Sequence, residues 1–272
     1  MNILVTLNKN YLPYLISLIR SINDSNKCLF DFFIFSNDIE EKDIMEYQKY
    51  LSLDNKYHII KIDSQEFINA PITSRYPYEM YYRIFAVKYL PQHLERILYL
   101  DPDIIVKGDL SSLYNLDFKG NYFAACSNVK KVLKRINQIK NGASKNCEYV
   151  NTGVLLMNLK ALRLHQNEED VYRFIEERKH LLTLPDQDII STLYGDKIIL
   201  LDRLKYNLSE KAIISHNILA LNTKDFIDIS WVEKNTVIIH YLGRNKPWKP
   251  SYRGILKPFY DKYAVKYEKK NK

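Results

Sequence analysis

The chain has 272 residues, 46% of them hydrophobic and 26% charged, and its formal net charge is +8. This is the composition of a soluble globular protein, long enough for one α/β domain with insertions, and no apolar run approaches the roughly 18 residues that a membrane span needs. The seven glycines form neither a G-x-G-x-x-G nor a G-x-x-x-x-G-K-[ST] pattern, which excludes a standard dinucleotide fold and a P-loop NTPase.

The first part of the chain alternates apolar strands with helices. Strands are predicted at 3–7, 31–36 and 57–62, and helices at 13–22 and 40–51. This alternation is typical of a mostly parallel sheet with helices on its faces. No basic leader precedes the first strand, so we expect no signal peptide and a cytoplasmic protein.

The rest of the chain continues this pattern. Pro77 opens and Pro91 stops a predicted helix at 77–90, and a strand at 96–100 runs directly into Asp101-Pro102-Asp103. Asn167 is expected to cap a helix at 167–182. The other predicted elements are a basic helix or lid-like segment at 130–140, helices at 186–193 and 252–267, and strands at 104–106, 122–127, 153–157, 197–201 and 236–241.

The C-terminal segment differs from the rest in charge. Ten basic and two acidic residues lie at 244–272, so we interpret it as a basic, aromatic tail on a catalytic domain at 1–243. Such a tail suits the surface of an anionic membrane. We expect no nucleic-acid partner. Packing on the domain is the alternative that we prefer, because four apolar side chains form a helical stripe: Leu256, Phe259, Tyr260 and Tyr263.

Asp101 and Asp103 are candidate metal ligands. They follow an apolar strand, at the edge of the sheet where α/β proteins bind ligands. Aspartates at strand ends commonly form turns, but two charges in so apolar a stretch need a compensating partner, and carboxylates suit Mg²⁺ or Mn²⁺. His240 ends another apolar strand and is a candidate third ligand, although a histidine there is more often structural. Gly243 and Lys246 then supply a turn and a cation suited to a diphosphate.

Three further polar motifs have an ordinary structural interpretation as well as a functional one. They would be a turn before a core strand, an acidic helix N-terminus and an aromatic–arginine helix face: Asn151-Thr152-Gly153, Asp186-Gln187-Asp188 and Tyr81-Tyr82-Arg83.

Taken in order, these motifs resemble glycosyltransferase family 8, a retaining group with the GT-A fold that includes glycogenin and bacterial lipooligosaccharide galactosyltransferases. The order and spacing of the motifs are more specific than any one of them. The matching stretches extend over nearly the whole chain: 1–11, 81–86, 90–109, 149–158, 186–188 and 240–248.

The resemblance implies transfer of a glucose or galactose unit from a UDP-sugar to a glycan, lipid-linked or protein acceptor, as in cell-envelope glycan synthesis. Asp101, Asp103 and His240 would hold Mn²⁺ or Mg²⁺ on the UDP phosphates, which Gly243 and Lys246 would also contact. The nucleoside would lie against Asn8, Asn10 and Tyr11. The donor sugar would be surrounded by Arg83, Asp103, Asn151, Asp186 and Gln187.

Two residues depart from the family pattern. Asn8 stands where an acid often accepts from the uracil imide, although its amide oxygen can also accept, and Lys9 replaces a commonly acidic residue. Uridine is therefore the expected base on the strength of the other motifs.

Retention of configuration at the sugar carbon would normally suggest a carboxylate nucleophile. Because the expected position holds Gln187, we predict same-face attack, in which a UDP phosphate oxygen takes the acceptor proton. A nucleophilic Asp186 or Asp188 is the less favoured alternative. Two other functions are weighed: a sugar-phosphate nucleotidyltransferase, disfavoured because no glycine-rich loop follows the first strand, and an inactive UDP-sugar-binding paralogue.

Overall fold

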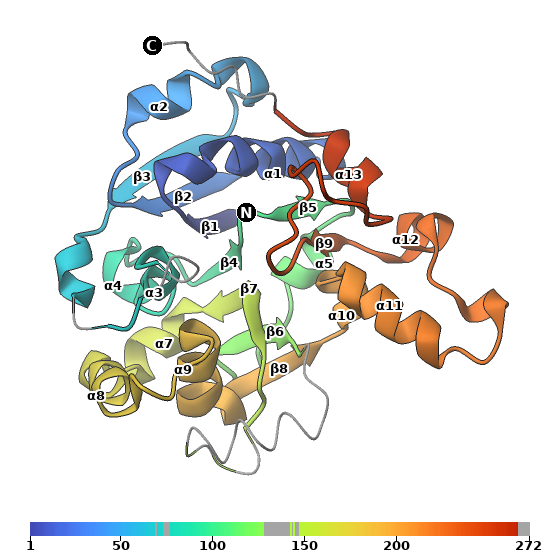
Figure 1. Ribbon diagram of the computed structural model, residues 1–272. Helices are drawn as coiled ribbons and strands as arrows, with labels where there is room; N and C mark the ends of the chain where they lie inside the picture. Colours follow the sequence, from blue (N-terminus) through green and yellow to red (C-terminus); the bar gives the residue numbers. More distant parts are fainter. Residues whose placement is uncertain (69, 73–76, 128–141, 143, 145–146, 266–272) are drawn as a thin grey trace.

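A computed structural model describes residues 1–68, 70–72, 77–127, 142, 144 and 147–265 (Figure 1). Its main sheet contains β1 (Asn2–Thr6), β2 (Asp31–Ser36), β3 (Lys56–Lys61), β4 (Arg96–Leu100), β6 (Phe123–Cys126), β7 (Asn151–Asn158) and β8 (Ile198–Leu201). The strand order is β3-β2-β1-β4-β7-β6-β8, and β7 alone among these strands runs antiparallel to its neighbours. The predicted α/β fold with a mostly parallel sheet is confirmed.

Helices cover both faces of this sheet. Along β1, Ile3 and Val5 pack against α1 (Leu12–Ser25), and Leu4 packs into the cluster on the opposite face. This division follows from the alternation of side chains along a strand. The opposite face is covered mainly by α7 (Leu159–His165), α8 (Glu168–Arg178) and α9 (Pro185–Tyr194) (Figure 1). Asn167 caps α8 as predicted, since its side chain accepts from the backbone of Glu169.

A second, two-stranded sheet brings distant parts of the chain together. It pairs β5 (Ile104–Val106) with β9 (Ile238–His240) in antiparallel register, with Ile104 opposite His240. The backbone N–H of Tyr241 then donates to the carbonyl of Asp103 at 3.1 Å. This pairing places the residues that follow β4 beside the residues that end β9.

Two predicted helices are shorter in the structure. The helix expected at 40–51 consists of α2 (Glu41–Met45) and a 3₁₀ turn at Gln48–Tyr50. The helix expected at 77–90 is interrupted between α3 (Glu79–Tyr82) and α4 (Ala86–Tyr89). Bonds of the i→i+3 type tighten the chain there, from Ile84 to Tyr81 at 2.9 Å. The break leaves Arg83 between the two helices. The segment expected at 130–140 lies outside the described residues.

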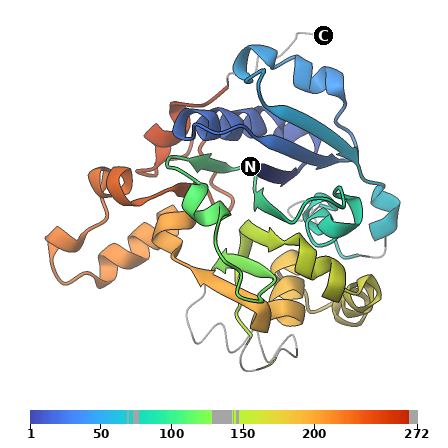
Figure 2. The same cartoon turned by 180° about the vertical axis from the view of Figure 1, so that it is seen from behind.

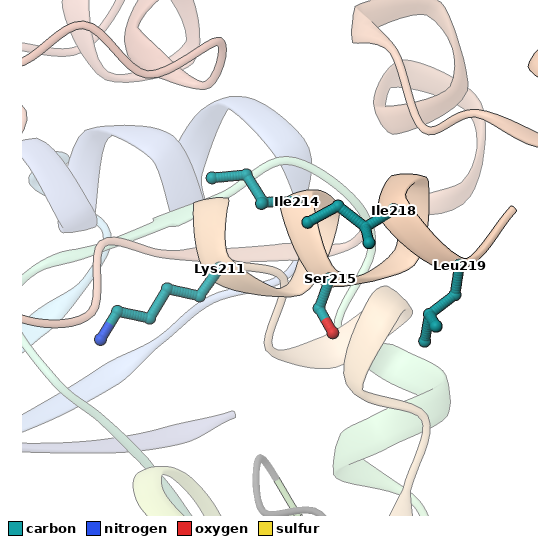
Figure 3. Close-up of a pocket in the computed structure, with 5 residues that line it drawn as sticks. All are labelled: Lys211, Ile214, Ser215, Ile218 and Leu219. Atoms are coloured by element: carbon teal, nitrogen blue, oxygen red, sulfur yellow. The ribbon is translucent and has the colours of Figure 1, made fainter.

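The remaining part of the chain before β9 contains helices that periodicity did not predict. They are α10 (Arg203–Tyr206), α11 (Glu210–Leu219) and α12 (Ile229–Asn235), and α5 (Ser111–Tyr114) follows β5 earlier in the chain. In α11, Ile213 is buried but Ile214 and Ile218 are 56% and 76% exposed. Figure 3 shows these two exposed side chains, which line a pocket together with Ser215. A helix without a single apolar stripe escapes detection by periodicity.

The C-terminal tail packs on the domain. In Figure 1 and Figure 2 its red segment, with α13 (Lys257–Asp261), lies beside the blue α1. Tyr252, Tyr260 and Tyr263 are buried, and Trp248 stacks on Tyr14 with ring centroids 3.6 Å apart. The structure therefore supports the packing alternative for the aromatic side chains, although the helix is shorter than the 252–267 that we expected. None of the described helices has the length and apolar character to cross a bilayer.

Candidate active site

The predicted site residues converge on one cavity of about 570 Å³ beside the carboxyl ends of β1 and β4. Eleven of the twelve line it: Asn8, Tyr11, Arg83, Asp101, Asp103, Asn151, Asp186, Gln187, His240, Gly243 and Lys246. The twelfth, Asn10, is exposed and is not among the lining residues, and its backbone N–H donates to Oδ1 of Asn8 at 3.2 Å. Asn10 therefore helps to hold Asn8 through its backbone instead of forming the cavity wall.

Asp101, Asp103 and His240 form a compact group of potential metal ligands, called the metal group below. Each offers one ligand atom, and these atoms lie within 4.8 Å of one another. Nε2 of His240 is 3.2 Å from Oδ1 of Asp103 and 3.5 Å from Oδ2 of Asp101. Two carboxylates and an imidazole make a donor set that suits Mn²⁺ and related divalent cations. The residues present therefore fit a metal ion.

Gly153 allows this group to be so compact. A Cβ atom at this position in β7 would lie 2.2 Å from Cε1 of His240 and 2.5 Å from Oδ2 of Asp101. Both distances are far below a van der Waals contact, so only glycine leaves room for the two side chains here. The sequence links the motif that contains Gly153 to the donor sugar through Asn151 and gives no sign of this steric role of Gly153.

Arg83 links the metal group to the region assigned to the sugar. Its guanidinium lies 2.9 Å from Asp101 and 3.3 Å from Asp186, and it stacks over the Tyr99 ring at 4.2 Å. Burial opposes its charge, but the adjacent Asp101 and Asp186 raise the pKa of Arg83 above its usual value. Burial raises the pKa of Asp186, although Arg83 and the hydroxyl of Thr152, at 2.6 Å, act in the opposite direction.

Lys246, in the C-terminal segment that follows β9, contacts the metal group. Its ammonium donates to Oδ2 of Asp103 and, at 2.9 Å, to the carbonyl of Tyr241. Burial acts to raise the pKa of Asp103, but Lys246 and His240 together hold it well below its usual range. Asp103 is therefore ionised at neutral pH, and Lys246 balances that charge.

The motif at 186–188 divides between two roles. Gln187 lines the cavity and is partly exposed. The buried Asp188 does not line it: its carboxylate accepts from the Tyr149 hydroxyl at 2.8 Å and from the backbone of Thr183 and Leu184 at 2.8 and 3.1 Å. These bonds tie Asp188, in the first turn of α9, to the residues that precede the helix, so the structure does not support Asp188 as the nucleophile.

Lys9 and Asn8 point in different directions. The ammonium of Lys9 lies 2.6 Å from Asp43, outside the cavity, whereas Asn8 lines the cavity next to Tyr11. Lys9 therefore forms an ion pair with α2, outside the cavity, and only the departure at Asn8 alters the cavity wall.

A further buried residue that was not predicted from the sequence, Asn207, supports His240 in the metal group. Oδ1 of Asn207 lies 2.8 Å from Nδ1 of His240. Asn207 follows α10, in the part of the chain where no element was predicted, and an isolated asparagine there gave no signal.

Comparison with known proteins identifies the relatives of this chain. The family model described as glycosyl transferase family 8 matches residues 2–251. The chain belongs to glycosyl transferase family 8. The chain is 30% identical over 250 residues to the lipopolysaccharide 1,2-glucosyltransferase of Escherichia coli, covering 89% of this chain and 71% of that protein. It is 26% identical over 234 residues to the lipopolysaccharide 1,3-galactosyltransferase of Salmonella typhimurium, covering 80% of this chain and 63% of that protein.

The fold of this family-8 chain also matches solved structures. A crystal structure of the galactosyltransferase LgtC with donor and acceptor sugar analogues superposes with a TM-score of 0.81 at 22% identity, covering 97% of this chain and 95% of that one. At this identity the likeness supports the GT-A fold. Family membership selects a glycosyltransferase over the nucleotidyltransferase alternative.

Proposed function

We propose that this chain transfers a hexose from a UDP-sugar to a glycan acceptor, with a divalent cation and with retention of configuration at the sugar. The observation that carries the proposal is the convergence of Asp101, Asp103 and His240 in the cavity that Arg83 and Lys246 also line. Two carboxylates would repel a diphosphate, so a cation must separate them.

In this proposal, Asp101, Asp103 and His240 would hold Mn²⁺, or Mg²⁺, which would neutralise charge on the departing diphosphate. Lys246 acts on the same charge from the tail side, where Gly243 turns the chain at a φ of 93°. Fixed positive charge stabilises the transition state more than the ground state, because the leaving group gains charge as the bond breaks. We thus assign the catalytic domain to 1–243 and the completion of the diphosphate site to 244–272.

The donor sugar would lie beside Gln187, Asn151, Arg83 and Asp186. Gln187 is a poor nucleophile, and the Asp186 carboxylate is held by Arg83 at 3.3 Å and by the Thr152 hydroxyl at 2.6 Å. An ion-paired carboxylate is less free to attack carbon. These contacts favour same-face attack, in which a UDP phosphate oxygen accepts the proton of the acceptor hydroxyl as the sugar–phosphate bond breaks.

The nucleoside would lie against Asn8 and Tyr11. Oδ1 of Asn8 accepts from Asn10, and its second lone pair can accept from a uracil imide. The relatives transfer glucose or galactose in lipopolysaccharide synthesis, so we propose an envelope glycan as the acceptor and UDP-glucose as the first donor to test. We also propose that the protein acts in the cytoplasm. Because the tail aromatics are buried by packing, contact with an anionic membrane would be made by the tail lysines.

A screen of UDP release tests this function. UDP-glucose and UDP-galactose are incubated with the protein and Mn²⁺, with and without excess EDTA, and free UDP is measured. We expect slow hydrolysis of one donor that EDTA abolishes and that a suitable acceptor accelerates. Equal activity in EDTA would contradict the role of the metal, and no release from either donor would favour an inactive sugar-nucleotide-binding protein.

A further inference from the structure

We propose that Asn207 is a positioning residue, which holds the His240 imidazole with Nε2 turned toward the metal ligands and orients Asn151 with the same side chain. Asn207 does not line the cavity, so this role is separate from any contact with substrate. The inference rests on the proposed metal site and deepens it.

The three side chains form a buried chain of hydrogen bonds. Oδ1 of Asn207 lies 2.8 Å from Nδ1 of His240, and Nδ2 of Asn207 donates to Oδ1 of Asn151 at 2.9 Å. The exposed fractions of Asn207, His240 and Asn151 are 0%, 1% and 8%. Water cannot readily replace these bonds, so each one that is lost leaves a buried polar group without a partner.

A backbone donor fixes the direction of the whole chain. The N–H of Gly153 lies 3.3 Å from Oδ1 of Asn151, and a backbone N–H can only donate. Asn151 therefore presents its oxygen, and Asn207 must present its NH₂ group to it. The oxygen of Asn207 then faces Nδ1 of His240, which must carry a proton. In the neutral imidazole, Nε2 is left with its lone pair directed at Asp101 and Asp103.

Backbone bonds place Asn207 next to β9. The N–H of Leu208 donates to the carbonyl of Ile238 at 3.0 Å, and the N–H of His240 donates to the carbonyl of Leu208 at 2.8 Å. Asn207 and His240 are therefore anchored to each other through the main chain as well as the side chains. Turning the imidazole away from the metal group would break the buried bond to Asn207. Outer partners of metal-binding histidines generally fix the orientation of the ring in this way.

Two substitutions separate the two functions of the Asn207 amide. Asn207→Leu removes both bonds at similar size, whereas Asn207→Asp keeps an acceptor for His240 and loses the donor to Asn151. We expect Asn207→Leu to weaken Mn²⁺ binding in the presence of UDP by about 10- to 100-fold. Asn207→Asp should keep the Mn²⁺ affinity within about threefold, while its kcat falls at least about tenfold because Asn151 is no longer held.

Electron spin-echo spectroscopy of bound Mn²⁺ gives a readout that stability alone does not move. The wild type should show ¹⁴N modulation from a coordinated imidazole, Asn207→Asp should retain it, and Asn207→Leu should weaken it. Asn26→Leu is the matched control: Asn26 is also buried and bonds to Ile22 and Leu110, outside the cavity, so it should lower Tm and leave the Mn²⁺ signal unchanged.

The outcomes distinguish this inference from the proposed function. Absence of ¹⁴N modulation in the wild type would refute His240 as a ligand, and the inference with it. Normal modulation and affinity in a folded Asn207→Leu would overturn the inference alone. If Asn207→Leu does not fold, Asn207→Asp decides: loss of the ¹⁴N signal despite a retained acceptor would overturn it.

Discussion

Gly153 and His240 approach each other so closely that any side chain on Gly153 would displace the imidazole: a Cβ atom there would lie 2.2 Å from Cε1 of His240. The conflict is with a residue whose ring is buried and hydrogen-bonded to Asn207, so moving the ring would strain or break that bond. The compact metal group is thus a consequence of a missing side chain in the neighbouring strand.

Gly153→Ala should therefore weaken Mn²⁺-dependent UDP binding by at least about tenfold, because it pushes both His240 and Asp101 from their positions. Isothermal titration with UDP and Mn²⁺ measures this. Val154→Ala, one residue along β7, is the control: it opens a cavity in the core and lowers Tm, and it should leave UDP affinity unchanged. Unchanged UDP affinity in a folded Gly153→Ala would show that the metal group tolerates the shift.

Asp103→Asn should reduce turnover by at least about 100-fold, which is about 2.7 kcal/mol of transition-state stabilisation, while the fold survives. The neutral amide can still accept from Lys246, but it is a poor metal ligand. The measurement is kcat at saturating Mn²⁺ together with circular dichroism. Asp109→Asn, which changes an exposed carboxylate that accepts from Ser111, should behave as wild type. Comparable activity in the two variants would refute the assignment.

Gln187→Ala should lower kcat much more than it weakens UDP binding, because Gln187 is proposed to contact the sugar and not the nucleotide. Single-donor kinetics and UDP titration, carried out on the same preparation, separate the two effects. Gln48→Ala changes an exposed glutamine far along the chain and should change neither quantity. A parallel loss of UDP affinity and rate would move Gln187 to the nucleotide site.

Truncation after Ser251 should destabilise the protein by at least about 3 kcal/mol, because it removes the buried Tyr252, Leu256, Tyr260 and Tyr263. Chemical denaturation of the full chain and the truncated chain measures the loss. A truncated protein as stable as the full chain would contradict the packing of the tail.

Membrane contact needs a gentler test than truncation. Replacing Lys269, Lys270 and Lys272 with glutamine removes charge without removing the packed aromatics. If the tail lysines bind lipid phosphate, co-sedimentation with anionic vesicles should occur at low salt, fall with added salt and weaken in this variant. No binding of the wild type at low salt would leave packing as the function of the tail.

Periodicity predicted the strands well because each is a short apolar run with a clear end, as in 31–36 and 96–100. The carboxylates after β4 and the histidine at the end of β9 could be paired before the structure because their motifs occur in a known order. The role of Gly153 and that of Asn207 could not, since both depend on which distant atoms lie within a few ångströms. The break after α3 was missed for the same reason: Arg83 is drawn to Asp101 and Asp186 by contacts that no local pattern records.

The bond between Lys246 and Asp103 joins residues 143 positions apart. Every strand of the main sheet has been synthesised before Lys246, His240 being the last of the proposed metal ligands along the chain. Closing so long a loop costs conformational entropy, so we expect the site to be completed after the local elements have formed. During synthesis, a nascent chain that already holds the whole sheet would therefore bind a sugar nucleotide tightly only after the segment that carries His240 and Lys246 has emerged and docked.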